Sequence, residues 1–448
     1  MISNVFPEKL RNIFVRGFKK EDRDLKTGLF HYLVNTEYEK SRVHLRIDPD
    51  GHGTLIVNAN RVMHLNQTAC LIAQLVLEKK PEDEAVKIIR KKFQVGEDQV
   101  RQDWDLISSQ VMELTRPDGA CPIHEMDLDT IPPFSTRPTA PYRMDLALTY
   151  RCNNQCSHCY NERDRIQTEL STIEWKKVLD ITWNLGIPHI VFTGGEPTLR
   201  EDLPELIAYA EANGQITGLN TNGRRLADEK YLTSLVNAGL DHVQITVESN
   251  SAQVHNEMVK AKAFDQTISG LKNALASPLY VMTNTTMLKT NIQTIPATLD
   301  LFGELGLKTV GLNALIHSGK GATVGTGLPE SELTSLLQLA REKTQARNQK
   351  LIWYTPTQYC GFDPQMLNLG VKGCTAALYN MCVEPDGAVL PCQSYYSPVG
   401  NLLSSDWDQI WNHELCLSLR ERKNLPVKCN SCALISECGG GCPLEFNQ

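Results

Sequence analysis

The sequence lacks a run of about 18 apolar residues, so no segment has the composition of a membrane-spanning helix. Its first twenty residues also lack the basic-then-apolar pattern of a signal peptide, and we expect a cytoplasmic protein with no membrane partner. An excess of positive charge is missing as well. The formal net charge is −7, which gives no general attraction to nucleic-acid phosphates, and we expect no nucleic-acid partner.

Cysteine is the residue type that this chain has in unusual number. The 448 residues suggest about three domains, and an apolar content of 41% is ordinary for a globular protein. Fourteen cysteines are present, and eight of them fall in the segment from Cys374 to Cys442. In a long cytosolic chain such a distribution favours metal or redox chemistry over disulfides. Cys70 and Cys416 lie in helical patterns, and we interpret both as packing residues.

Residues 1–115 have the pattern of a small domain with a β-hairpin and three helices. The alternating stretches 41–48 and 53–58 flank a turn signal, and Asn66 precedes the first helical pattern as an N-cap residue does. This order resembles the winged-helix peptide-recognition domains of the PqqD-like kind. The resemblance implies binding of a peptide leader, which we expect to pair with the edge of the hairpin. An unrelated helical appendage and a DNA-binding winged helix are the alternatives, the second disfavoured because the segment is not markedly basic.

Strands and helices alternate from residue 142 to residue 325, after a proline-rich stretch, 116–141, that predicts a linker. Repeats of this kind require a parallel sheet with right-handed crossovers, whose ligands bind where the strands end. Six repeats rather than eight predict an α/β fold with a partial (β/α)6 TIM-like barrel. The winged-helix-like domain precedes this barrel, and a cysteine-rich region, 326–448, follows it. The six predicted strands are Met144–Leu148, His189–Phe192, Ile216–Leu219, His242–Val247, Tyr280–Thr286 and Thr309–Leu312.

The loop after the first predicted barrel strand carries three cysteines with the spacing C-x3-C-x2-C. They are Cys152, Cys156 and Cys159. Three thiolates on one short loop can bind three irons of a cubane iron–sulfur cluster and leave the fourth iron open. A structural zinc site needs a fourth protein ligand close by, and none follows in the sequence. An open iron is a site for a substrate or a cosubstrate.

Glycines and polar residues follow the next strands at the same rim of the predicted barrel. In Gly194-Gly195-Glu196-Pro197 the glycines would let the backbone approach a ligand and supply N–H donors. Glu196 would offer its carboxylate to an ammonium group. The third strand ends in Asn220-Thr221-Asn222-Gly223 and the fourth in Thr246-Val247-Glu248-Ser249. These segments are candidate ligand contacts.

The cysteine loop, an adjacent aromatic residue and the later G-G-E-P together resemble the signature of the radical S-adenosylmethionine (SAM) superfamily. The resemblance implies that SAM chelates the open iron and that a 5′-deoxyadenosyl radical abstracts a hydrogen from the substrate. The family often has Ser-Leu-Asp-Gly where this chain has Thr246-Val247-Glu248-Ser249, so a hydroxyl and a carboxylate remain but their detailed roles are open. The implied SAM contacts are Tyr160, Gly194, Gly195, Glu196, Asn222, Thr246 and Glu248.

The cysteines near the carboxyl terminus resemble the SPASM extension of radical SAM maturases. The run C-x2-C-x5-C-x3-C is specific, and a zinc ribbon would need a second C-x2-C pair in this region. The resemblance implies two auxiliary 4Fe–4S clusters, and thus three clusters in the chain. Its ligands for the first would be Cys374, Cys382, Cys392 and Cys442, and for the second Cys429, Cys432 and Cys438.

The second auxiliary cluster lacks a predicted fourth ligand. The family supplies one more cysteine downstream of the run, and no cysteine follows Cys442 in this sequence. Cys360, in a turn-like segment just upstream of the region, is the best candidate. Cys416 has the pattern of a helix core residue, and the Glu445 carboxylate is a poorer ligand for cluster iron than a thiolate. An iron left open to a substrate thiolate is the other alternative.

The leading hypothesis is a radical SAM/SPASM enzyme that modifies a peptide by a cross-link, thioether, epimerisation or oxidation. Its partners would be that peptide and an electron donor such as flavodoxin or ferredoxin. A maturase of a cofactor or tetrapyrrole, of the haem-pathway kind, keeps the same chemistry with another substrate. A third hypothesis is an iron–sulfur electron-transfer protein. The open three-cysteine site and the G-G-E-P turn argue against it, because electron transfer needs neither.

Overall fold

The computed structural model describes residues 26–35, 40–58, 61–115, 138–161 and 168–445. The chain divides into two compact units. The first contains residues 1–131 with 184–188, and the second contains 132–183 with 189–448. The predicted linker, 116–141, lies mostly outside the described residues, as does Cys121.

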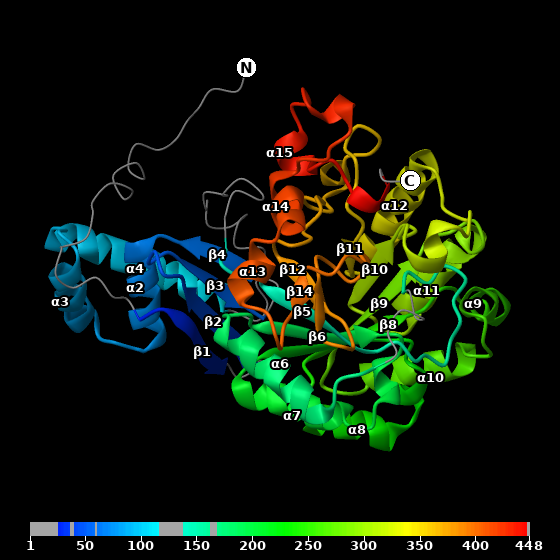
Figure 1. Ribbon diagram of the computed structural model, residues 1–448, viewed down its shortest axis with the longest axis horizontal. Helices are drawn as coiled ribbons and strands as arrows, with labels where there is room; N and C mark the ends of the chain where they lie inside the picture. The colour runs from blue at the N-terminus through cyan, green and yellow to red at the C-terminus, as the bar shows by residue number, and fades with distance from the viewer. Residues whose placement is uncertain (1–25, 36–39, 59–60, 116–137, 162–167, 446–448) are drawn as a thin grey trace. The chain divides into compact units, whose positions relative to one another are not determined.

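The N-terminal unit is a four-stranded antiparallel sheet followed by three helices (Figure 1). Its strands pair in chain order, and the predicted hairpin forms the two central strands. Asn66 caps the first helix, since its Oδ1 accepts from Ala69 N at 2.9 Å. The elements are β1 (Gly28–Asn35), β2 (Lys40–Ile47), β3 (Gly53–Val57), β4 (Arg61–Leu65), α2 (Gln67–Leu77), α3 (Glu82–Lys92) and α4 (Glu97–Leu114).

The position of the predicted hairpin in this sheet corrects one expectation. β1 pairs with β2 from Gly28 opposite Ile47 to Asn35 opposite Lys40, and β4 pairs with all of β3. Neither strand of the hairpin therefore has an edge at which a peptide could add. β1 and β4, which were not predicted from the sequence, are the outer strands of the sheet.

The second unit is built on a ten-stranded sheet in the order β11-β10-β9-β8-β7-β6-β5-β12-β13-β14. The strands from β11 to β12 run parallel, β13 pairs antiparallel with β12, and β14 pairs antiparallel with β13. The fold is the predicted α/β partial barrel, with β11 as a further parallel strand. The strands are β5 (Arg143–Thr149), β6 (His189–Gly194), β7 (Ile216–Thr221), β8 (His242–Thr246), β9 (Tyr280–Thr286), β10 (Thr309–Asn313), β11 (Lys350–Trp353), β12 (Asn380–Val383), β13 (Ala388–Leu390) and β14 (Gly400–Asn401).

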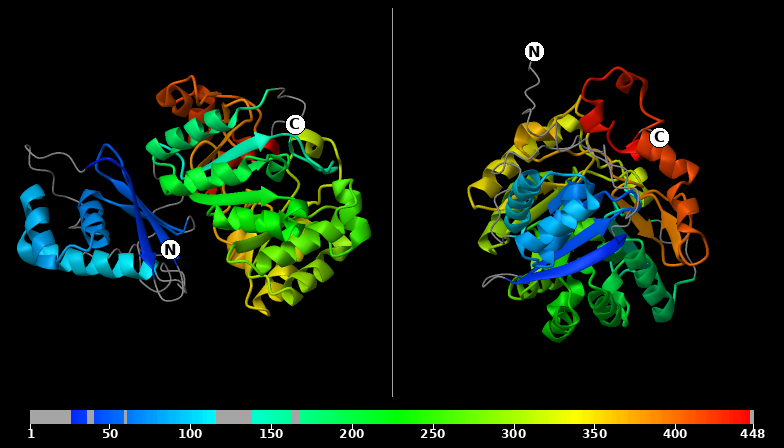
Figure 2. Two further views of the ribbon diagram at one scale, coloured as in Figure 1. Left: turned by 90° about the horizontal axis from the view of Figure 1, so that it is seen from below. Right: turned by 90° about the vertical axis from the view of Figure 1, so that its left-hand side faces the viewer.

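Helices cover the outer face of this sheet (Figure 2). Alternate residues of the strands point to opposite faces. One set is apolar and buried, as Leu146, Phe192 and Leu219 are, and the other is polar, as Asp145 and Gln244 are. The inner face of the partial barrel is therefore polar. The crossover helices are α6 (Thr172–Asn184), α7 (Leu203–Asn213), α8 (Glu229–Asn237), α9 (Ala252–Val259), α10 (Phe264–Leu275), α11 (Ile295–Glu304) and α12 (Glu330–Gln345).

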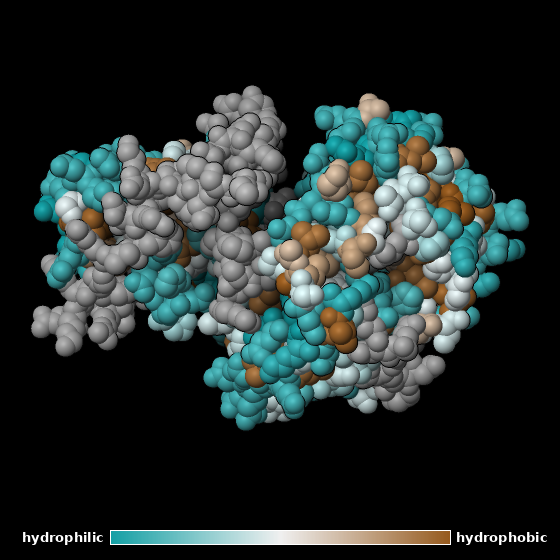
Figure 3. Space-filling view, turned by 90° about the horizontal axis from the view of Figure 1, so that it is seen from above, coloured by the Kyte–Doolittle hydropathy of each residue, from teal (hydrophilic) through white to brown (hydrophobic). Residues whose placement is uncertain are grey.

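After the last strand of the sheet, the cysteine-rich region continues with three short helices (Figure 1). They are α13 (Trp407–Trp411), α14 (Glu414–Glu421) and α15 (Ile435–Cys438). Cys70 in α2 and Cys416 in α14 are both fully buried, which confirms them as packing residues. On the face shown in Figure 3, apolar residues are scattered among hydrophilic ones. Among the described residues, no helix combines the length and apolar character that crossing a membrane requires.

Candidate functional site

The three-cysteine loop begins three residues after β5 and rests on the end of α9. Gln155 N donates to Val259 O and Ser157 N to Met258 O, both at 2.9 Å. The three cysteines are partly exposed. Asn154 N also donates to Cys152 Sγ at 3.4 Å. The backbone thus holds the loop while its thiols stay accessible.

The G-G-E turn after β6 packs directly against the start of the cysteine loop. Gly195 N donates to Thr149 O at 2.7 Å and Glu196 N to Arg151 O at 2.9 Å. Gly194 has φ +124°, and a Cβ there would collide with Thr149 O. The Gly195 N–H is thus used within the protein, whereas Gly194 and Gly195 remain predicted SAM contacts. The two glycines let the turn hold the backbone that leads into Cys152.

The Glu196 carboxylate is also engaged within the protein. The side chain is buried, and its oxygens accept from Thr198 N and Oγ1, from Thr221 Oγ1 at 2.7 Å and from Asn222 N at 2.8 Å. Burial raises the pKa of Glu196, and these hydrogen bonds oppose the rise. The carboxylate joins the ends of β6 and β7, which differs from its expected exposure to an ammonium group.

The end of β7 holds the cysteine loop from the other side. Asn222 Nδ2 donates to Asn153 Oδ1 at 2.7 Å. Arg224 Nη1 donates to Asn153 O at 2.6 Å and to Asn154 Oδ1 at 3.0 Å. Asn222 is therefore beside the cluster loop, as a residue that lines a ligand there would be.

A buried pair links the cysteine loop to the end of β8. His158, between two of the cysteines, is 9% exposed, and its Nε2 lies 2.9 Å from Glu248 Oε1. The other Glu248 oxygen accepts from Thr286 N at 2.9 Å. Thr246 remains partly exposed on the inner face of β8. Glu248 is one of the SAM contacts predicted from the sequence. His158 was not predicted, although its position between two cysteines was an available signal.

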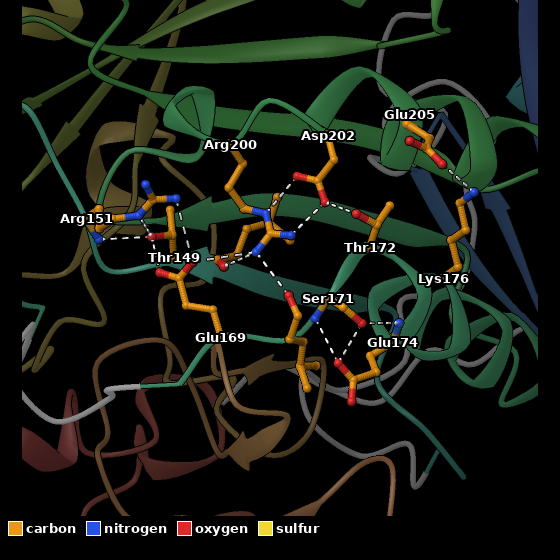
Figure 4. Close-up of polar contacts among 12 residues, drawn as sticks. Thr149, Arg151, Glu169, Ser171, Thr172, Glu174, Lys176, Arg200, Asp202 and Glu205 are labelled. Atoms are coloured by element: carbon orange, nitrogen blue, oxygen red, sulfur yellow. Dashed lines mark hydrogen bonds and ion pairs between the residues drawn. The ribbon is translucent and has the colours of Figure 1, made fainter.

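A charged network braces the strand end that precedes Cys152 (Figure 4). Arg200 is buried and forms a bidentate pair with Asp202 at 2.8 and 2.6 Å. Its Nη1 donates to Leu170 O at 3.1 Å and lies 3.6 Å from Glu169 Oε2. Glu169 also accepts from the Thr149 hydroxyl. These contacts tie the segment after the G-G-E turn to the end of β5.

Each of the four cysteines predicted for the first auxiliary cluster lies near enough to at least one other to affect a pKa. Burial raises the pKa of Cys392 to about 12, and the nearby Cys374 adds to that rise. Burial raises the pKa of Cys442 as well, and both of those thiols contribute to it. Cys382 is buried on β12, and burial, Asp145, Glu384 and then Cys392 raise its pKa.

Backbone N–H groups point at the sulfurs of these cysteines. The donors are the N–H groups two residues after Cys374, Cys392 and Cys442. Cys152 has the same kind of contact from Asn154. Such bonds favour the thiolate form, which is the form that binds iron.

Comparisons with known proteins agree with this geometry. Residues 146–302 match the radical SAM superfamily, and residues 374–433 match the SPASM family, an iron–sulfur cluster-binding domain. Fe-coproporphyrin III synthase of Methanosarcina barkeri is 30% identical over 327 residues, which cover 65% of this chain and 81% of that protein. The chain belongs to the radical SAM superfamily.

Two solved structures share the fold of this radical SAM enzyme. Streptococcus suis SuiB, crystallised with its precursor peptide SuiA, has 16% identity and a TM-score of 0.68, covering 93% of this chain and 97% of SuiB. The structure of anSMEcpe with AdoMet and a peptide has 17% identity and a TM-score of 0.53. It covers 67% of this chain and 89% of that one.

The residues present fit the cofactors of a radical SAM enzyme with a SPASM domain, which are a 4Fe–4S cluster, SAM and auxiliary clusters. No three His, Cys, Asp or Glu side chains within the described ranges converge closely enough to hold a single metal ion. A cubane cluster needs wider spacing, because each thiolate binds a different iron. The three accessible thiols and the N–H donor to Cys152 suit such a cluster.

Hydrogen bonds join the cysteine loop of the barrel to the SPASM domain. They involve residues that follow Cys159 in the loop and Cys392 in the SPASM domain. Tyr160 Oη donates to Gln393 Oε1 at 3.2 Å, and Tyr396 Oη donates to Asn161 Oδ1 at 3.2 Å. Asn161 Nδ2 in turn donates to Gly194 O at 2.5 Å. Burial raises the pKa of Tyr160, so its hydroxyl stays protonated and acts as the donor. The loops that carry Cys159 and Cys392 are thus fixed to each other.

Proposed function

We propose that this radical SAM enzyme modifies a peptide, whose leader is bound by the N-terminal unit. The observation that carries the proposal is the four-stranded sheet of that unit, with β1 and β4 as its outer strands. An extended peptide adds to a sheet through main-chain hydrogen bonds at an outer strand. Because both strands of the predicted hairpin are already paired, the proposed site moves to β1 or β4.

The likeness to SuiB supports this proposal. The structural match with SuiB covers 93% of this chain. The 7% that lies outside the match contains fewer residues than the N-terminal unit does. Part of that unit therefore lies within the match. SuiB is a protein that binds a precursor peptide. The same architecture suits a leader site and a catalytic barrel carried on one chain.

A bound 4Fe–4S cluster with SAM would supply a 5′-deoxyadenosyl radical that takes a hydrogen atom from the substrate. Cys152, Cys156 and Cys159 would hold the cluster, and the polar inner face of the barrel would orient the substrate. Two auxiliary clusters in the SPASM domain would bring the total to three. Flavodoxin or ferredoxin is the proposed class of electron donor.

The test uses the anaerobically reconstituted full-length enzyme with dithionite, SAM and peptides encoded by short reading frames next to its gene. We expect 5′-deoxyadenosine and a mass change in one peptide. A variant with all three loop cysteines changed to alanine should form neither product. Deoxyadenosine formation by that variant would refute the proposed roles of the loop cysteines.

The N-terminal unit is tested by removing residues 1–115. The shortened enzyme should still cleave SAM without substrate, because its three-cysteine loop is intact, and should lose turnover on the full-length peptide. Equal turnover of the peptide by the two forms would contradict a leader site in this unit.

A tetrapyrrole substrate is the second candidate, favoured by the 30% identity to Fe-coproporphyrin III synthase. The two candidates share the radical chemistry and differ in what the N-terminal unit does. Fe-coproporphyrin III, the tetrapyrrole in that name, replaces the peptide in the same assay. A change in its mass that depends on SAM, together with no change in any peptide, would favour this candidate.

A further inference from the structure

The segment between β11 and the SPASM match packs against the last cysteine run of the chain. Tyr359 N donates to Cys438 Sγ at 3.3 Å, and Cys438 Sγ lies 3.5 Å from Thr357 O. Gln365 Nε2 donates to Glu437 Oε2 at 2.6 Å. Two stretches that lie about 70 residues apart in the sequence are therefore held together around one sulfur.

This packing places a further thiol at the site. Cys360 directly follows Tyr359, whose N–H contacts Cys438, and the Cys360 side chain is exposed. Burial raises the pKa of the Cys429 thiol, and the negative charges of Cys438, Cys360 and Cys432 add to that rise. The other three thiols therefore each lie within electrostatic reach of Cys429. Cys416, in contrast, is fully buried in α14.

The loop that carries Cys360 is fixed on both sides of this residue. Tyr359 is buried, and its Oη accepts from Lys372 N at 2.9 Å. After Cys360 a 3-10 turn, Pro364–Leu367, begins with Asp363 accepting from Gln365 N at 2.9 Å. A thiol on such a fixed loop needs little ordering to bind a metal cluster, whereas an unfixed loop would lose conformational entropy.

We propose that Cys360 is the fourth thiolate ligand of a 4Fe–4S cluster held by Cys429, Cys432 and Cys438. Cys360 precedes the matched SPASM segment, 374–433, so one ligand of this cluster would come from outside that segment. On binding, the thiol releases its proton to solvent and forms one sulfur–iron bond. The Tyr359 N–H to Cys438 would add a hydrogen bond to a ligand sulfur, which tunes the cluster potential.

The experiment uses the full-length chain with Cys152, Cys156 and Cys159 changed to alanine, so that only the auxiliary clusters remain. Cys360→Ser is compared with Cys416→Ser after anaerobic reconstitution, by iron and sulfide content and Mössbauer spectroscopy. We expect about eight irons per chain in the parent and the Cys416→Ser control. In Cys360→Ser we expect loss of between one and four irons, or one iron with altered parameters.

A ligand variant and a rescue make the result decisive. Cys432→Ser should give the same kind of spectral change as Cys360→Ser, because both would alter one corner of the same cluster. In Cys360→Ala a small exogenous thiol should occupy the vacated iron and restore the parent spectrum. The proposal is overturned if Cys360→Ser keeps the iron content and spectrum of the Cys416→Ser control while Cys432→Ser does not.

Discussion

At the scale of single residues, the His158–Glu248 pair determines how firmly the cysteine loop is attached to the barrel. Hydrogen bonds to a charged group are worth about 1.5–3 kcal/mol when buried. We expect His158→Gln and Glu248→Gln each to lower the free energy of unfolding of the cluster-free protein by about 2 kcal/mol.

A double-mutant cycle measured by denaturant unfolding checks this prediction. The double variant should be less destabilised than the sum of the two single variants, by about 1 kcal/mol or more. Fully additive effects would show that the two side chains do not stabilise each other. A matched loss of iron in both single variants would link the pair to cluster binding.

The burial of His242 in β8 predicts that the free energy of unfolding of the barrel depends on pH. Burial, and then the charge of Arg143, lower the pKa of this histidine to about 4 in the folded chain, against about 6.5 in an unfolded one. Between these pH values the unfolded state binds more protons, so stability is complete above pH 6.5 and falls as the pH drops toward 4. The loss should reach at most about 3 kcal/mol.

The measurement is the free energy of unfolding from pH 7.5 to pH 4.5, in the parent and in His242→Gln. The variant should show a shallower decline across this range. Parallel curves would mean that His242 does not titrate as its burial requires. His189 Nε2 lies 2.8 Å from His242 Nε2, so we assign the pH dependence of stability to this pair of histidines.

At the scale of elements, the turn at the end of β6 requires a glycine at position 194 for two separate reasons. Gly194 has a positive φ, and a Cβ would also collide with Thr149 O. We expect Gly194→Ala to displace the start of the cysteine loop and to lower the iron content of the reconstituted enzyme. Its stability should fall by more than the roughly 1–2 kcal/mol of backbone strain alone.

Gly306→Ala is the matched control. Gly306 has φ +74°, and a Cβ there would meet nothing within 4 Å. The control should therefore show the strain without the collision, and should keep its iron. If the two variants lose the same stability and retain the same iron, the contact with the cysteine loop is not what requires Gly194.

The sequence predicted features that are local and missed those that depend on distant partners. The cysteine spacing, the Asn66 cap and the strand pattern are contained in short segments, and all appeared at their predicted places. The N–H group of Gly195 looked available because its acceptor, Thr149 O, belongs to another strand end about 45 residues earlier. No periodicity reveals such pairing.

Strand pairing was missed for the same reason. β11 has only four residues, and its place in the sheet is set by pairing with β10. β1 and β4 were also missed, and their absence from the prediction made the hairpin look like an edge. The candidate site residues were predicted where a motif is contiguous. His158 was not selected, because its position between two cysteines was the only local signal and its partner Glu248 is 90 residues away.

At the scale of the whole second unit, a buried side-chain hydrogen bond adds to the strand pairing that connects the barrel to the hairpin of β12 and β13. Tyr150 Oη donates to Glu384 Oε1 at 3.0 Å, and Glu384 is fully buried. Burial raises the pKa of Tyr150, so the hydroxyl remains a donor at every working pH. Tyr150→Phe would leave the buried carboxylate with one donor fewer.

We expect Tyr150→Phe to destabilise this unit by about 1.5–3 kcal/mol. Unfolding is followed by circular dichroism in parallel with Tyr209→Phe. The Tyr209 hydroxyl contacts Asp180 on the helical layer at 3.0 Å and is far less buried, so this control should change stability by less than about 1 kcal/mol. Equal losses of stability in the two variants would show that the hydrogen bond to Glu384 stabilises the unit no more than the one between Tyr209 and Asp180.

The pairing of β12 with β5 sets an order of events during synthesis. β5 leaves the ribosome more than 200 residues before β12, its parallel partner from Asn380 to Val383. Throughout that interval the strand that leads into the first cysteine has one unpaired edge, which is an aggregation hazard in a growing chain. The cysteine loop also lacks its hydrogen bonds to Gln393 and Tyr396 until these residues have been synthesised. We therefore expect the cysteine loop to bind its cluster only after the partners in residues 380–396 have been synthesised.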